Sequence, residues 1–75
     1  MKTLYTIEQI ENNDTMYYTE SKEDAFNTYK EKYSGDVYEV CEYIVRGELN
    51  EDDITENATL FARYNQELID YLTND

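Results

Sequence analysis

The chain has 75 residues with 18 acidic and 6 basic side chains, so its formal net charge is −12. This length fits one domain, and we expect residues 1–75 to form a single compact unit. The sequence contains no histidine or proline and only one cysteine, but it has nine tyrosines. An aromatic content of 15% argues against disorder, because acidic disordered chains are poor in aromatic residues.

The charge excludes an ordinary nucleic-acid-binding protein, because phosphate binding needs clusters of lysine and arginine. It also disfavours binding to an anionic membrane surface. No apolar run approaches the roughly 20 residues that cross a bilayer, and the N-terminus lacks the apolar region of a signal peptide. A lone cysteine cannot form an internal disulfide, so we expect a reducing, cytoplasmic location.

Two strands are predicted at the start of the chain. Residues 3–10 are rich in threonine, isoleucine and tyrosine, which favour strands, and residues 15–19 have the same character. Between them lie Asn12, Asn13 and Asp14, residue types that tolerate left-handed backbone and bond their own chain. The segment therefore predicts a β-hairpin.

A helix is predicted over about 22–33. Ser21, with Asp24 three residues later, resembles a capping box with aspartate in place of glutamate. Gly35 follows the helical pattern and is a suitable stop. The apolar stripe of helical period comprises Ala25, Phe26, Tyr29 and Tyr33.

A central strand is predicted over 37–45, the longest run of β-branched and aromatic residues. Alternation places Glu39 and Tyr43 on one of its faces and Tyr38 and Glu42 on the other. Because both faces carry apolar residues, we expect the strand to be buried on both sides or to present one face to a partner.

A second helix is predicted over about 51–72. Asn50, with Asp53 three residues later, repeats the capping pattern, and three acids occupy the first turn, where the helix dipole favours negative charge. Asn65 interrupts the apolar stripe that follows. The stripe comprises Ile54, Ala58, Phe61, Leu68 and Leu72.

These elements predict an α+β fold of order β-β-α-β-α. A right-handed crossover places the third strand beside the first, which gives a three-stranded antiparallel sheet of spatial order 2-1-3. Both helices are expected to cover one face of this sheet, leaving the other face for solvent or a partner.

More than half of the net charge lies between Asp36 and Glu56, where eight acids face one arginine, a balance of −7. Solubility of a small domain requires a net charge of magnitude only about 2–8. Uncompensated charge also lowers stability, so the excess points to a cationic partner. With two strand tyrosines that suit a binding hot spot, the predicted partner-binding residues are Asp36, Glu39, Glu42, Glu48, Glu51, Asp52, Asp53, Glu56, Tyr38 and Tyr43.

One interpretation of this segment is nucleic-acid mimicry. Residues on the same face of a strand are about 6.6–6.8 Å apart. Carboxylates at that spacing, joined by the acidic run Glu51-Asp52-Asp53, could imitate a short row of phosphates. Such a row would attract the lysine and arginine residues of a basic groove.

In size, net charge, lack of histidine and cysteine chemistry, and the acidic segment 36–56, the chain resembles small acidic inhibitors of host defence encoded by phages. These include DNA-mimic anti-restriction proteins, uracil-DNA-glycosylase inhibitors and anti-CRISPR proteins. The resemblance implies a basic partner, such as a nuclease, in the cytoplasm of a host bacterial cell. It rests on overall character, so it assigns no role to any single residue.

Two other classes of function remain open. The first is an interaction or adaptor module that uses a tyrosine-rich sheet face, with a homodimer as one form of it. The second is an enzyme, which we do not expect, because histidine is absent and no glycine-rich loop is present. No cofactor is predicted. The acidic run Glu51-Asp52-Asp53 lacks the spacing of a calcium loop, and Glu39 and Glu42 fall on opposite strand faces, which disfavours a catalytic pair.

Overall fold

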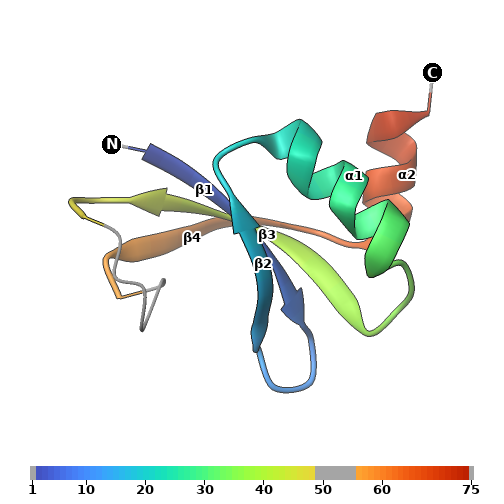
Figure 1. Ribbon diagram of the computed structural model, residues 1–75, viewed down its shortest axis with the longest axis horizontal. Helices are drawn as coiled ribbons and strands as arrows, with labels where there is room; N and C mark the ends of the chain where they lie inside the picture. The colour runs from blue at the N-terminus through green and yellow to red at the C-terminus, as the bar shows by residue number, and fades with distance from the viewer. Residues whose placement is uncertain (1, 49–55, 75) are drawn as a thin grey trace.

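The structure, a computed structural model, describes residues 2–48 and 56–74 (Figure 1). It is an α+β fold, as predicted, with an antiparallel sheet and two helices. The sheet has four strands in the order β2-β1-β3-β4, so the prediction of three strands is wrong. The elements are β1 (Lys2–Gln9), β2 (Thr15–Thr19), α1 (Lys22–Lys32), β3 (Tyr38–Val45), β4 (Ala58–Tyr64) and α2 (Gln66–Thr73).

The first hairpin and the first helix form where the sequence predicts them. Asn13 has a φ of 59°, and the Asn12 side chain accepts a hydrogen bond from the Asp14 amide, which closes the turn between β1 and β2. Ser21 accepts a hydrogen bond from the Asp24 amide and so caps α1. Gly35 follows the helix with a φ of 136°, a conformation that favours glycine.

The predicted second helix over 51–72 is wrong. Residues 51–55 lie outside the described part of the chain, Ala58–Tyr64 form strand β4, and the helical residues among those described after residue 55 are Gln66–Thr73. Pairing with β3 decides the outcome for β4, since Val40 lies opposite Tyr64 and Val45 opposite Ala58. Asn65 does not interrupt a helix. Its side chain accepts a hydrogen bond from the Leu68 amide and begins α2.

Strand β3 lies inside the sheet between β1 and β4 and has buried residues on both faces, which agrees with the first of the two alternatives that its composition left open. Val40 packs in a cluster with residues of both helices, so this side of the sheet is the helix face. Cys41 and Tyr43 belong to a second apolar cluster on the opposite side, here called the far face, together with Leu4 and Val45. Alternation along a strand produces this division.

Both helices pack on the helix face (Figure 1). Ile69 of α2 is fully buried, as is Tyr29 of α1. The Tyr29 hydroxyl donates to the Gly35 carbonyl at 2.8 Å and thereby ties the helix to the loop that leads into β3. Neither helix is long and apolar enough to cross a membrane, and this holds for the residues that the structure describes.

The first prediction concerns the docking of α2 through one residue. Ile69→Ala should lower the free energy of unfolding by about 2–5 kcal/mol, because it leaves a cavity in the core. The neighbouring Leu68 is 37% exposed, so Leu68→Ala is the matched control and should cost less than half as much. Urea unfolding followed by circular dichroism measures both. Equal losses would show that α2 does not dock through Ile69.

Candidate functional site

The described residues of the predicted partner-binding set in segment 36–56 do not share one surface. Asp36 precedes β3 and Glu48 follows it, so both exposed carboxylates flank the strand at opposite ends. The eight residues of β3 span about 26 Å at about 3.3 Å per residue. Glu51, Asp52 and Asp53 lie outside the described residues, as does the predicted helix start that contains them.

The predicted residues within β3 are divided between the two faces of the sheet. Glu39 and Tyr43 are buried on the far face, with only 8% exposure each. Tyr38 lies on the helix face, where its ring meets that of Tyr33 edge-on at 5.2 Å. Glu42 is half-buried on the same side and accepts a hydrogen bond from the Tyr64 hydroxyl at 2.6 Å. The strand therefore does not present its two glutamates as neighbouring exposed carboxylates.

Glu39 belongs instead to a buried polar network on the far face. Antiparallel pairing places it directly opposite Glu8, which is 4% exposed. Glu8 accepts hydrogen bonds from the hydroxyls of Thr6, at 2.6 Å, and Tyr43, at 2.5 Å. Like charges opposite each other on a sheet are destabilising, so these donors are needed to hold the pair.

Glu39 has its own partners. The Cys41 thiol donates to Glu39 Oε1 at 3.6 Å, and Arg63 Nη1 of β4 lies 3.6 Å from the same oxygen. Burial raises the pKa of the Cys41 thiol, and the nearby Glu8 and Glu39 carboxylates raise it further. Cys41 is thus buried, with 1% exposure, and its raised pKa disfavours the reactive thiolate form.

On the helix face, a phenol–carboxylate hydrogen bond joins Tyr64 of β4 to Glu42 of β3. Burial raises the pKa of Tyr64 to about 12, with the hydrogen bond and the charge of Glu42 as further causes. The ring of Tyr64 packs edge-on against Phe26 of α1 at 5.3 Å, and Lys22 Nζ lies 4.9 Å from its centre. The Glu42 carboxylate therefore accepts a hydrogen bond from a tyrosine that is itself packed against α1.

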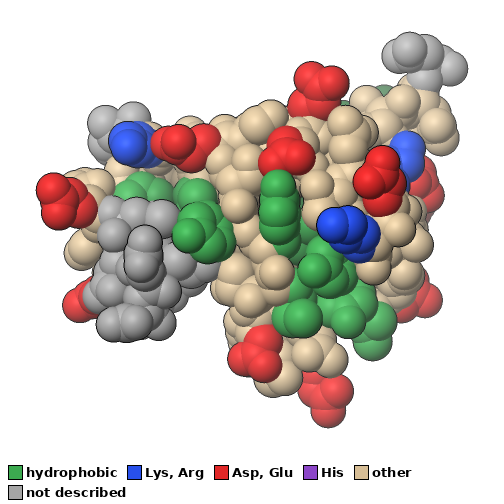
Figure 2. All heavy atoms as spheres, in the orientation of Figure 1, with side chains coloured by type: hydrophobic (Ala, Val, Ile, Leu, Met, Phe, Trp, Pro, Cys, Tyr) green, Lys and Arg blue, Asp and Glu red, His purple; other side chains and the backbone are tan. Residues whose placement is uncertain are grey.

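Most exposed carboxylates of the described residues form no ion pair with a described basic side chain. The described ion pairs are Lys2–Glu20, at 3.9 Å, and Arg63–Glu39. In the view of Figure 2, acidic side chains lie around much of the rim of the molecule, with few basic side chains between them. Within residues 2–48 and 56–74, the exposed carboxylates that form no ion pair include Glu11, Asp14, Glu23, Glu31, Asp36, Glu48 and Glu67.

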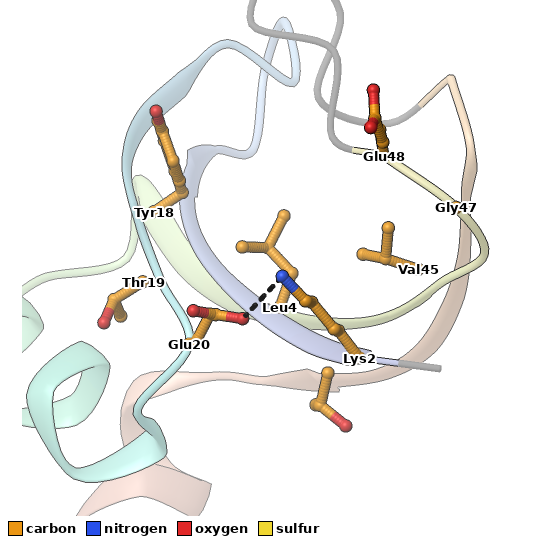
Figure 3. A pocket seen from close by; sticks show the side chains of 9 residues that line it. Lys2, Leu4, Tyr18, Thr19, Glu20, Val45, Gly47 and Glu48 are labelled. Carbon is orange, nitrogen blue, oxygen red and sulfur yellow. Dashed lines mark ion pairs between the residues drawn. The ribbon is translucent and has the colours of Figure 1, made fainter.

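A hollow of about 520 Å³ lies at the end of the sheet where β3 finishes. We call it the terminal hollow (Figure 3). Leu4 of β1 and Val45 of β3 form its apolar floor, and each is 3% exposed. Tyr18 stands at one side and Glu48 at the other, while the Lys2–Glu20 ion pair lies along the near edge. The other lining residues within the described part of the chain are Thr3, Thr19 and Gly47.

The backbone fixes one wall of the terminal hollow. The Arg46 amide donates to the Asn57 carbonyl at 2.8 Å, and Asn57 Nδ2 donates to the Glu48 carbonyl at 3.2 Å. These bonds join the end of β3 to the approach of β4 and bring Glu48 and the exposed Glu56 to the same end of the sheet. Gly47, between Arg46 and Glu48 in the chain, has a φ of 94°, a conformation that L side chains rarely adopt.

No protein-family model, characterised protein or solved structure matches this chain. The chemistry of the site must therefore be read from the residues themselves. No group of three or more histidine, cysteine, aspartate or glutamate side chains that could hold a metal occurs among the residues that the structure describes.

The residues that the sequence did not identify come mainly from the first hairpin. Glu8 shares its strand face with Leu4 and Thr6, a pattern visible in the alternation, but its pairing with Glu39 depends on the register between β1 and β3. Tyr18 and Glu20 reach the terminal hollow because β2 lies beside β1. Such contacts between distant segments leave no local signal.

The second prediction tests the hydrogen bond between Tyr43 and Glu8. Tyr43→Phe keeps the ring but removes a donor to a buried carboxylate, which should cost about 1.5–3 kcal/mol of unfolding free energy. Tyr71→Phe is the matched control, because Tyr71 is 77% exposed; this change should cost under about 0.5 kcal/mol. Chemical unfolding measures both. A Tyr43→Phe variant as stable as the parent would show that the bond contributes no stability.

The third prediction concerns alkaline pH. The Tyr64 pKa is about 12 in the folded chain and about 10 when unfolded. Above pH 10 the unfolded chain loses this proton while the folded chain keeps it, so stability should fall between about pH 10 and 12. Unfolding at graded pH measures the decline, which should be shallower for Tyr64→Phe. Glu42→Gln should lower the Tyr64 pKa, followed by tyrosinate absorbance; parallel behaviour of all three proteins would contradict the assignment.

Proposed function

We propose that the chain is an acidic inhibitor that binds the basic nucleic-acid-binding site of another protein. The partner class we favour is a bacterial defence nuclease, which makes the role anti-CRISPR or anti-restriction. The observation that carries the proposal is the set of exposed, unpaired carboxylates in a chain of net charge −12. Charge of this size attracts a basic groove and accelerates encounter.

The connection from β3 to β4 is the part of the chain best suited to imitate phosphates. It carries five acids and no base in the nine residues from Glu48 to Glu56. Glu48 and Glu56 lie at the same end of the sheet as Glu20, and three further acids fall between them in the sequence. The proposed mimic surface is therefore this end of the molecule together with the terminal hollow. Unlike the set expected from the sequence, it leaves out Glu39, which is buried, and Glu42, which is half-buried.

The alternative, an adaptor with a tyrosine-rich sheet face, has less support. Tyr5, Tyr17 and Tyr38 pack against the core cluster on the helix face, and Tyr43 is buried on the far face. Of the tyrosines on the described strands, Tyr18 is the one with substantial exposure, 46%. A broad tyrosine surface is thus not available on the described sheet.

The fourth prediction tests the proposed function directly. Cleavage by a panel of purified Cas effector complexes and restriction endonucleases is measured with increasing amounts of the protein, salt and competing DNA. Inhibition should weaken as salt rises, because ion pairing is screened, and competing DNA should relieve it. Inhibition that ignores both salt and DNA would contradict mimicry.

A charge-matched pair of variants locates the surface. Neutralising Glu48, Glu51, Asp52, Asp53 and Glu56 to their amides should weaken inhibition by about tenfold or more, which corresponds to about 1.4 kcal/mol. The control neutralises Glu11, Asp14, Glu23, Glu31 and Glu67, which removes the same charge elsewhere. Equal losses from both variants would show that the effect follows net charge alone.

A further inference from the structure

We infer that the terminal hollow receives an arginine side chain of the basic partner. This inference rests on the proposed function and names the chemical group that its surface recognises. It begins with the shape and lining of the hollow, which combines an apolar floor with carboxylates at the edge (Figure 3). A long side chain with an apolar stem and a cationic end matches both parts.

The floor suits the stem. Leu4 and Val45 are neighbours across the β1–β3 pair, in which Lys2 lies opposite Val45 and Leu4 opposite Tyr43. Both side chains point into the hollow in Figure 3. Because Leu4 and Val45 are each 3% exposed, a stem of three methylene groups would gain most of its apolar contact from the exposed Tyr18 ring, without taking its charged end out of water.

The edge suits the cation. The side chain of Glu20 is 68% exposed, and Glu48 is exposed with no ion pair to another described residue. Tyr18, across the hollow from Glu48 and two residues before Glu20 in the chain, is 46% exposed and offers its ring to the hollow. A planar guanidinium can stack on a tyrosine ring while it bonds a carboxylate with two parallel N–H groups, whereas an ammonium group can do neither as well. The lining therefore favours arginine over lysine.

Lys2 gives an internal indication of this preference for a cation. Its ammonium group lies 3.9 Å from Glu20 Oε1 at the edge of the hollow, so a positive group is already held there. The pair is loose, because the two side chains are 74% and 68% exposed. Exposed pairs of this kind contribute little, so an incoming guanidinium can replace Lys2 at Glu20.

The test uses the whole chain and three blocked tripeptides, acetyl-Gly-X-Gly-amide, in which X is arginine, lysine or citrulline. Backbone amide shifts are followed by NMR during titration. The arginine peptide should shift the residues lining the hollow and saturate with a dissociation constant on the order of 1 mM. The lysine peptide should bind more weakly, and citrulline, which has nearly the same shape without the charge, should not saturate. Shifts spread over all acidic regions would overturn the inference.

Variants make the test sharper. Glu20→Gln with Glu48→Gln should weaken arginine binding about fivefold or more, while Glu11→Gln with Glu31→Gln, the charge-matched control, should leave it within about twofold. Tyr18→Leu should remove the preference for arginine over lysine. Lys2→Gln should tighten binding, because it frees Glu20; an unchanged or weaker affinity in this variant would contradict the competition.

These outcomes are separate from those of the proposed function, because the peptides need no nuclease. If the arginine peptide saturates the hollow and no nuclease is inhibited, the inference about the hollow stands and the inhibitor proposal fails. If nucleases are inhibited but the peptide shifts show no preference for the hollow, the inhibitor proposal stands and this inference is overturned.

Discussion

The pairing of β1 with β3 is the constraint on which the rest of the structure depends. One register places Ile7 opposite Val40 on the helix face and Glu8 opposite Glu39 on the far face. A shift by one residue would exchange these faces, leaving carboxylates beneath the helices and aliphatic side chains where Tyr43 and Thr6 donate hydrogen bonds. The aliphatic side chains can be buried beneath the helices without hydrogen-bond partners, whereas the carboxylates can be buried only on the far face, where they have donors. Both groups of residues therefore favour the same register.

This register also determines which charges are available for binding. Carboxylates inside the sheet are committed to internal donors: Glu8 to Thr6 and Tyr43, and Glu42 to Tyr64. Several carboxylates at the turns and strand ends, among them Glu11, Asp36 and Glu48, are exposed and form no ion pair with another described residue. The excess negative charge is thus concentrated in the parts of the chain where solvent can stabilise it and where a partner can reach it. A high acidic content in the sequence does not by itself distinguish these two groups.

Local signals predicted about half of the fold. The turn at Asn12–Asp14, the cap at Ser21 and the strand over 37–45 depend on neighbouring residues, so the sequence contains their causes. Segment 58–72 was different, because its apolar residues fit helical spacing while Ala58–Tyr64 pair with β3. Tertiary pairing overrode the helical pattern there. Of the candidate site, Glu48 and Glu56 were identified, whereas Leu4, Tyr18 and Glu20 come from distant segments that only the fold brings together.

The fourth strand changes the meaning of the acidic segment. A helix from 51 to 72 would have displayed its first-turn acids on a regular surface beside β3. Strand β4 instead turns the residues from Glu48 to Glu56 into the connection of a hairpin, joined by the Arg46–Asn57 hydrogen bond. The acids at the two described ends of this connection, Glu48 and Glu56, are exposed at this end of the sheet. Because the terminal hollow lies at this same end, the partner that we propose would meet the exposed Tyr18 ring and the carboxylates together there. In that proposal, long-range attraction and short-range selectivity act at one place, which neither the net charge nor the hollow could provide alone.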